Sequence, residues 1–284
     1  MKNLIVPIDF SEESLAGLDL AFLFNQKQKT MIQMVYVQKK SSDYNSPGYF
    51  KEEKAFAEKQ FKDIIDKYSK KLKNDSQLKY IIKEGRIYRE VVAQVESFKE
   101  AMVVASTHGA SGFEDFFIGS NAYKIISATH QPVMTIRSLE APAEIKKIVM
   151  PIDLTLDTRQ KVPLTCEVAK LFDAEIHVIT VSSSKSKRII DRLNAYASQV
   201  ETYVKARKLK CKVKSFVGDN IVDLITVYAD SVDAGMLSIM KEQPKTLSFI
   251  GTFTNQIVSR SKVPVLAISS KEIHIATGFS ASAG

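Results

Sequence analysis

The sequence lacks the features that define several large classes of protein. Its two cysteines, Cys166 and Cys211, form no Cys-x-x-Cys pair and have no metal-ligand spacing. We therefore expect both thiols to be buried, reduced and inert. Apolar runs never reach the roughly eighteen residues of a membrane span, and the first apolar run is too short for a signal peptide. These absences predict a cytoplasmic protein with no membrane partner.

Signals for nucleic-acid binding, metal binding and catalysis are also missing. The net charge is +8, but the densest basic cluster, around Lys70 and Lys71, shares its region with acidic residues, as a solvated helix face does. No basic stripe alternates with aromatic residues, so we expect no nucleic-acid partner. The histidines have no zinc spacing, and no P-loop occurs. His108 with Glu114 and Asp115 are the nearby general-base candidates, so we expect no enzyme, with slow ATP hydrolysis left open.

What the chain does contain is a regular alternation of apolar runs and helical patterns. In the first half, apolar runs at 4–9, 32–37, 80–82, 101–105 and 132–136 alternate with helical patterns, one of which carries an apolar stripe from Phe50 to Tyr68. A polar loop is expected around Pro47. Such alternation is typical of right-handed βαβ crossovers, so the sequence predicts an α/β fold with a doubly wound parallel sheet.

The second half repeats the first. The segment from Lys147 to Asp153 matches Asn3 to Asp9, and the same offset carries Ile32 onto Ile176 without a gap. A shorter offset then carries Gly119 onto Gly251. We therefore predict two tandem domains, at residues 1–138 and 145–270, followed by a tail of small and polar residues at 271–284. Pro163 falls inside the first helix of the second copy, where it is expected to kink or shorten that helix.

One stretch, from Ser106 to Ser120, has the features of an anion site. It contains Gly109, Gly112 and Gly119, follows an apolar strand and precedes a helical pattern. Glycines let backbone N–H groups approach a ligand, and a helix N-terminus attracts negative charge. In the second copy, Lys241 replaces Gly109 and Pro244 replaces Gly112, so we expect that copy to be a structural partner.

Asp9 ends the first predicted strand. If the first and fourth strands are neighbours where the strand order reverses, Asp9 and the glycine-rich stretch face each other across one crevice. Asp9 would then accept hydrogen bonds from a base or ribose, and Val37 would form an apolar wall. Asp9 as a turn or capping residue, and Ser120 as a simple helix cap, are the alternatives.

Together these motifs resemble the universal stress protein family in its tandem two-domain form. The resemblance is carried by Val6 to Ser11, by Thr107 to Gly112 with Gly119 and Ser120, and by Gln131 to Met134. It implies five-stranded parallel sheets of order 3-2-1-4-5, pairing of the two domains through their last strands and, in one subclass, binding of ATP with Mg. Ser106 replaces the first glycine of that subclass's motif. The residues implied to lie along the nucleotide are Pro7, Ile8, Asp9, Val37, Gly109, Gly119, Ser120 and Asn121. We add Ser106, at the position of the missing glycine, and His108, which we expect to bond the backbone or to contact the ribose.

Two functions of different class remain open. The first is a nucleotide-binding regulatory protein of the stress response, with ATP in the first domain only. The second is a ligand-free scaffold for protein interaction, in which the glycine-rich stretch survives as a tight turn. In both, we expect the strands at 133–136 and 265–268 to pair the two domains, because a short apolar edge strand needs cover. The sequence does not indicate a protein partner, and a homodimer stays possible.

Overall fold

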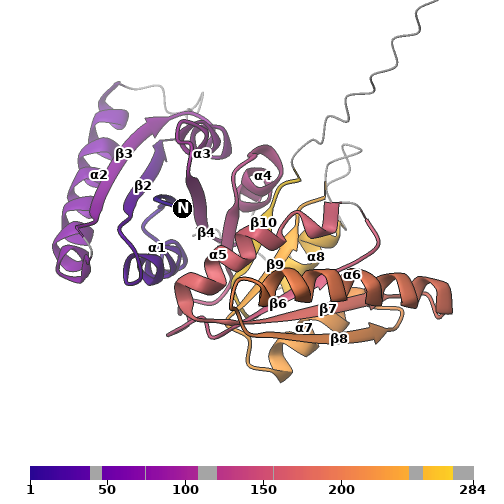
Figure 1. Ribbon diagram of the computed structural model, residues 1–284. Coiled ribbons are helices and arrows are strands. Elements are labelled where there is room, and N and C mark those ends of the chain that lie inside the picture. Colours follow the sequence, from indigo (N-terminus) through magenta and orange to yellow (C-terminus); the bar gives the residue numbers. More distant parts are fainter. Residues whose placement is uncertain (39–46, 74, 108–119, 156, 243–251, 271–284) are drawn as a thin grey trace, which may run out of the picture.

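The computed structural model describes residues 1–38, 47–73, 75–107, 120–155, 157–242 and 252–270 (Figure 1). Strands and helices alternate throughout both halves. In the first half they are β1 (Asn3–Pro7), α1 (Glu12–Asn25), β2 (Met31–Gln38), α2 (Pro47–Tyr68), β3 (Gln77–Glu84), α3 (Ile87–Glu96), β4 (Ala101–Ser106), α4 (Ser120–Ala128) and β5 (Val133–Ile136). In the second they are β6 (Lys147–Ile152), α5 (Val162–Phe172), β7 (Glu175–Ser182), α6 (Lys187–Lys205), β8 (Cys211–Val217), α7 (Ile221–Ser231), β9 (Met236–Met240), α8 (Phe253–Arg260) and β10 (Val265–Ile268).

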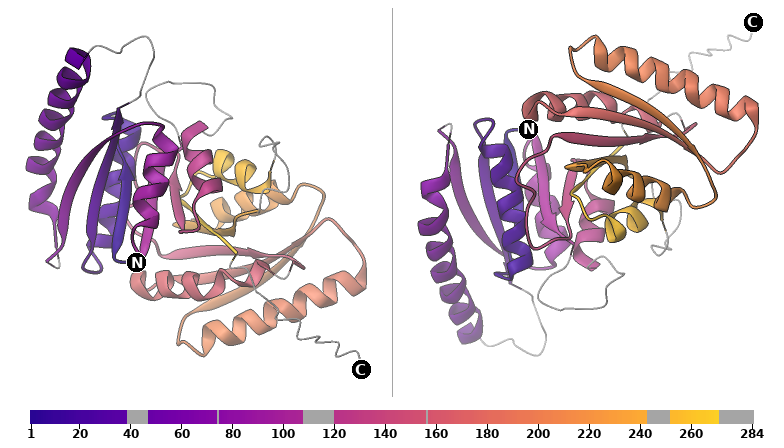
Figure 2. Two further views of the ribbon diagram at one scale, coloured as in Figure 1. Left: turned by 90° about the horizontal axis from the view of Figure 1, so that it is seen from above. Right: turned by 90° about the horizontal axis from the view of Figure 1, so that it is seen from below.

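All ten of these strands belong to one sheet, in the order β3-β2-β1-β4-β5-β10-β9-β6-β7-β8. Each half is parallel and has the predicted order 3-2-1-4-5. The halves join where β5 pairs antiparallel with β10, with Met134 opposite Leu266. The predicted pairing of the two domains through their last strands is therefore confirmed. Figure 2 shows the halves side by side, with β3 and β8 at opposite ends of the continuous sheet.

Helices cover both faces of the sheet. One apolar cluster joins α1, α2, α5 and α6 to one face, and a second joins α3, α4, α7 and α8 to the other. The first cluster crosses the boundary between the halves, where the rings of Phe24 and Phe172 meet edge to face at 5.0 Å. The prediction of a doubly wound α/β fold is confirmed, because helices cover both faces of a sheet that is parallel within each half. This covering buries the apolar strands on both sides.

Helix α2 differs from its prediction at two points. The expected loop around Pro47 is the first turn of the helix, where proline's fixed φ and missing N–H are tolerated. The expected core stripe contains Phe61, which is fully buried, but Phe56 is 53% exposed. The rings of Phe56 and Phe10 meet edge to face, at 6.0 Å between centroids. The sequence pattern overestimated the width of the buried face of α2.

Pro163 shortens the first helix of the second half, as expected. Helix α1 begins directly after its N-cap Ser11, whereas α5 begins only at Val162 and has proline in its first turn. A 3₁₀ turn, Asp157–Arg159, occupies part of the intervening chain. Because α5 starts later, the 3₁₀ turn contacts β9 in the second half. Residues of this turn line the cavity that is described below.

Candidate functional site

The turn after the first strand has the same hydrogen bonds in both repeats. Oδ1 of Asp9 accepts from the backbone N–H of Ser11 at 3.1 Å and from its hydroxyl at 2.5 Å. Oδ1 of Asp153 accepts from the corresponding groups of Thr155 at 2.7 and 2.6 Å. Asp9 is thus a turn residue, one of the two alternatives, while the N-cap of α1 is Ser11. Both carboxylates are exposed, so the turn also presents them at the carboxyl edge of the sheet.

Phe10 fixes the backbone next to Asp9. Its φ of 67° is in the left-handed region, which a bulky side chain adopts only when its surroundings hold it there. The Phe10 ring lies 5.0 Å from the ring of Tyr36 and 5.1 Å from that of Phe61, between centroids. Packing against β2 and α2 thus determines the direction in which the chain carries Asp9 out of the sheet.

The strand order brings most of the sequence-predicted site residues to one edge. β1 pairs with β2 on one side and with β4 on the other, so the order reverses at β1 and β4 as expected. The ends of β1, β2 and β4 and the start of α4 share this carboxyl edge. The described residues placed there are Pro7, Ile8, Asp9, Val37, Ser106, Ser120 and Asn121. Three others, His108, Gly109 and Gly119, lie outside the described residues, as do Glu114 and Asp115.

Gly17 is a residue of this site that the sequence interpretation missed. It lies in α1, and a Cβ at this position would stand 3.3 Å from the backbone nitrogen of Ser106. The glycine therefore lets α1 pack against the end of β4, from which the chain continues into the glycine-rich stretch. The aligned repeats held the signal, because Lys161 takes the place of Gly17 in the second copy.

The second repeat has a cavity at its own carboxyl edge. The cavity has a volume of about 910 Å³ and is lined by the Asp153 turn, the end of β7, the end of β9 and the start of α8. Tyr123 and Ile126 of α4 complete its wall, so the first repeat also contributes. We predicted a purely structural role for the second repeat because its loop lacks the glycines. The described residues nevertheless leave a cavity there.

Lys161 is the most deeply buried charged residue in that wall. Only 1% of its surface is exposed. Its Nζ donates to the carbonyl oxygen of Thr158 at 2.5 Å and to the Thr158 hydroxyl at 3.2 Å. Burial lowers the pKa of the amine to about 7, and the nearby Asp153 carboxylate opposes that effect only in part. A lysine with this environment changes charge near neutral pH.

Lys241, which replaces Gly109, connects the two repeats. Its Nζ donates to the carbonyl oxygens of Ile126 at 2.9 Å and Thr129 at 2.6 Å, at the carboxyl end of α4. A cation at this position satisfies carbonyl groups that the helix leaves without partners, and it complements the helix dipole. Arg137 makes the related contact in the opposite direction, from Nη1 to the carbonyl oxygen of Ser259 near the end of α8.

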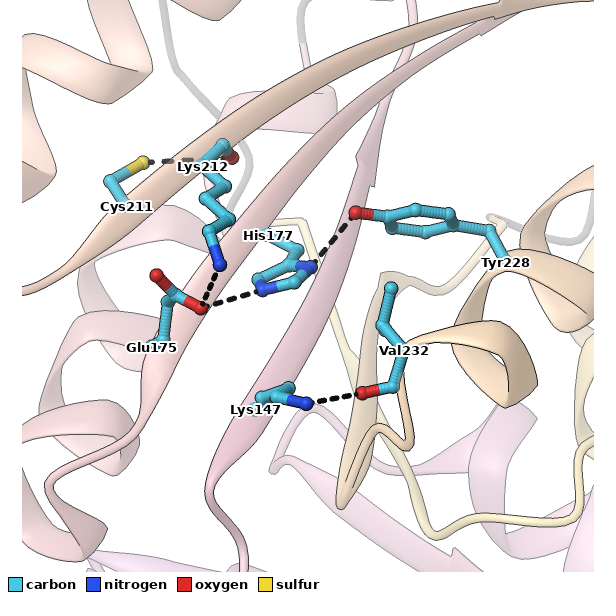
Figure 3. A network of polar contacts seen from close by, with 7 residues as sticks. All are labelled: Lys147, Glu175, His177, Cys211, Lys212, Tyr228 and Val232. Carbon is cyan, nitrogen blue, oxygen red and sulfur yellow. Dashed lines mark hydrogen bonds and ion pairs between the residues drawn. The ribbon is translucent and has the colours of Figure 1, made fainter.

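A polar network lies at the other end of the strands of the second repeat (Figure 3). The ring of His177 lies between the Tyr228 hydroxyl, 2.9 Å from Nδ1, and the Glu175 carboxylate, 2.9 Å from Nε2. Lys212 pairs with the same carboxylate at 3.0 Å. Burial would raise the pKa of Glu175, but the contacts with His177 and Lys212 outweigh it and lower that pKa. Both ring nitrogens have protein partners, so this histidine has a structural role.

The described residues show no feature of a metal or thiol centre. None of their histidine, cysteine, aspartate and glutamate side chains form a group of three or more that could hold a metal ion. Both cysteines are free, and burial raises the pKa of each thiol to about 11. Cys166 is buried as predicted, whereas Cys211 is only half-buried. Within the described part of the chain, no helix has the length and apolarity needed to cross a membrane.

Comparison with known proteins matches both repeats to one family. The model described as "Universal stress protein family" matches residues 1–137 and again residues 144–269. A universal stress protein structure from Archaeoglobus fulgidus DSM 4304 has a TM-score of 0.79 at 17% identity, covering 95% of this chain and 97% of that one. A putative universal stress protein from Pseudomonas aeruginosa UCBPP-PA14 has a TM-score of 0.66 at 14% identity, covering 95% and 94%. No curated protein matches the chain.

Proposed function

Because the chain belongs to the universal stress protein family, whose model matches both repeats, we propose that it is an ATP-binding regulatory protein of the stress response. The nucleotide binds in the first repeat, at residues 1–138, and the protein acts in the cytoplasm by binding rather than by catalysis. The observation that carries this proposal is the reversal of strand order between β1 and β4. Asp9 follows β1 and α4 is the next helix after β4, so both belong to the carboxyl edge where these neighbouring strands end.

The residues at this edge fit an adenine nucleotide. The Asp9 carboxylate is exposed and held by Ser11, so it is oriented to accept from a base or ribose group. Val37, 8% exposed at the end of β2, offers an apolar surface for the base. Gly17 allows close packing of α1 below Ser106, at the strand end that leads into the glycine-rich stretch. Backbone N–H groups of Gly109, Gly119 and Ser120 would hold the phosphates, and Mg²⁺ would arrive with ATP.

The two Asp turns provide a matched test. Asp9→Ala and Asp153→Ala remove the same hydrogen bonds from equivalent turns, so their structural effects should be similar. In calorimetric titrations with Mg-ATP, we expect the unmodified chain to bind one equivalent. We also expect Asp9→Ala and Gly109→Val to lose binding, and Asp153→Ala to retain it. Acid release of a copurified nucleotide is a simpler first experiment.

Two results would count against this function. Absence of heat with Mg-ATP would favour the alternative, a ligand-free interaction scaffold of the same fold. Equal losses in Asp9→Ala and Asp153→Ala would mean that the variants act by loosening the turns, without contact between Asp9 and nucleotide. Binding of two equivalents would contradict the restriction of ATP to the first repeat.

A further inference from the structure

The cavity in the second repeat combines an apolar interior with a single buried charge. Apolar side chains from four elements line it, and the residues that matter here are Val181, Leu193, Ile239 and Phe253. Its volume of about 910 Å³ lies within the range of small-molecule sites, roughly 300–1,000 Å³. The wall therefore suits a ligand with an apolar body.

Lys161 lacks a carboxylate partner at ion-pair distance among the described residues. Its two hydrogen bonds are both with Thr158, which lines the same cavity. An ammonium group has three donors, and these two contacts use two of them. A buried cation normally requires an anion close by, because burial without one is costly. Lys161 therefore has one hydrogen-bonding position and one charge to offer to a ligand.

The carboxylates of the wall already have donors of their own. Asp153 accepts from Thr155, Asp157 accepts from the side chain of Gln160, and Glu242 accepts from the backbone of Thr254. These three acids outnumber the two lysines in the described part of the wall, Lys161 and Lys241. A ligand with several negative charges, such as a triphosphate, would be repelled, whereas one negative charge placed at Lys161 would be matched.

The difference between Gly17 and Lys161 at matched positions of the two repeats also supports a ligand role for Lys161. Gly17 in the first repeat allows close packing of helix and strand, and in the second repeat a lysine occupies this place beside a cavity. A buried, unpaired lysine lowers stability, so packing does not account for it. Lys241, at the position of Gly109, is engaged with α4 and leaves Lys161 as the available cation.

We propose that the cavity of the second repeat is a separate ligand site for a small organic acid with an apolar body, and that Lys161 binds its carboxylate. This site does not depend on ATP binding in the first repeat. The apolar part of the ligand packs among the side chains from β7, α6, β9 and α8, and Thr158 holds the lysine amine in position. Because Tyr123 and Ile126 belong to α4, the ligand also contacts the first repeat.

Octanoate is a suitable probe, with octanol and octylamine as neutral and cationic analogues of the same length. We expect calorimetry on the full chain at pH 7 to show octanoate binding with one equivalent, and much weaker binding of both analogues. Lys161→Met should weaken octanoate binding by about tenfold to a hundredfold, the effect of one charge-assisted hydrogen bond. It should leave octanol binding unchanged.

Three comparisons make the result decisive. Lys170→Met changes an exposed lysine of α5, the helix that begins directly after Lys161, and should bind octanoate as the unmodified chain does. Lys161→Gln serves as a second variant if the methionine protein does not fold. Equal affinity for octanoate and octanol, or full octanoate affinity in both Lys161 variants, would overturn the proposal. Competition by excess ATP would assign octanoate to the nucleotide site instead, and would also overturn it.

Discussion

Nζ of Lys241 lies 2.6 Å from the carbonyl oxygen of Thr129, so a residue at the end of β9 caps a helix of the other repeat. The same amine reaches the Ile126 carbonyl at 2.9 Å. Burial lowers the pKa of Lys241 to about 8, with Glu96 opposing this effect, so the side chain is mostly charged at neutral pH. In the first repeat this position is Gly109, a glycine of the predicted phosphate loop. In the second repeat it is Lys241, which connects the two repeats.

Lys241→Ala should destabilise the protein, because the Ile126 and Thr129 carbonyls lose the lysine donor and Thr129 keeps only the longer bond from the Ser269 hydroxyl, at 3.3 Å. We expect the free energy of unfolding to fall by about 1.5–3 kcal/mol, the usual range for a hydrogen bond to a charged group. Urea unfolding measures this change. Lys262→Met, which removes only an exposed ion pair with Asp230, is the control and should change stability by less than about 1 kcal/mol. Equal effects of the two substitutions would contradict a bridging role for Lys241.

Lys161 should make stability depend on pH in a definite direction. Its folded pKa is about 7, below the value of 10.5 for a free lysine. Between these pH values the unfolded chain binds more protons, so stability rises as the pH increases from about 7 towards 10 and is lost as the pH falls through this range. Lys161→Met should remove the part of this rise that Lys161 causes, and only the rise that Lys241 causes above about pH 8 should remain. The substitution should itself raise the free energy of unfolding at pH 7 by a few kcal/mol (about 1–4).

The measurement is a series of urea unfolding curves between pH 7 and 9.5 for the unmodified chain and for Lys161→Met. Lys170→Met is again the control, because this lysine of α5 is exposed. Its pH profile should match that of the unmodified chain. A profile for Lys161→Met that ran parallel to the unmodified one would show that the amine is not buried in solution.

Gly17→Ala should separate nucleotide binding from stability. Alanine favours a helix interior by about 1 kcal/mol, but its Cβ would stand 3.3 Å from the backbone nitrogen of Ser106. We expect these effects nearly to cancel in urea unfolding, while the displaced strand end lowers ATP affinity several-fold in calorimetry. Gly218→Ala, in the connection between β8 and α7, is a control for the added Cβ alone, since the nearest atoms it would meet belong to the Leu224 side chain, also at 3.3 Å. Unchanged ATP affinity in Gly17→Ala would show that Gly17 does not contribute to the nucleotide site.

Tyr228→Phe should cost stability without affecting ligands. It deletes the hydroxyl that meets Nδ1 of His177 at 2.9 Å in the interior of the second repeat. A buried group that loses its partner costs about 1–3 kcal/mol. Because His177 and Glu175 lie near the amino end of β7, octanoate and ATP titrations should not change. Tyr196→Phe, at a half-buried tyrosine of α6, is the control for loss of a phenolic hydroxyl.

The sequence was sufficient for the architecture but not for the second cavity. Matching segments such as Asn3–Pro7 and Lys147–Ile152 predicted the duplication, and short apolar final strands predicted the β5–β10 pairing, because both follow from local pattern and from the need to cover a sheet edge. Lysine is normally exposed, so nothing local predicts the burial of Lys161. Its environment depends on Pro163 delaying the start of α5 and on the distant strand β9.

The antiparallel pairing of β5 with β10 has an evolutionary consequence. In a symmetric dimer of identical chains, each substitution appears twice, at both symmetry-related positions. Here the two partners are encoded in one chain and joined in one sheet, so each position varies independently. The two repeats do differ at matched positions, with Gly17 opposite Lys161 and Gly109 opposite Lys241 in the aligned sequences. Fusion also keeps the partners together at any dilution, which leaves each repeat able to specialise without losing the other.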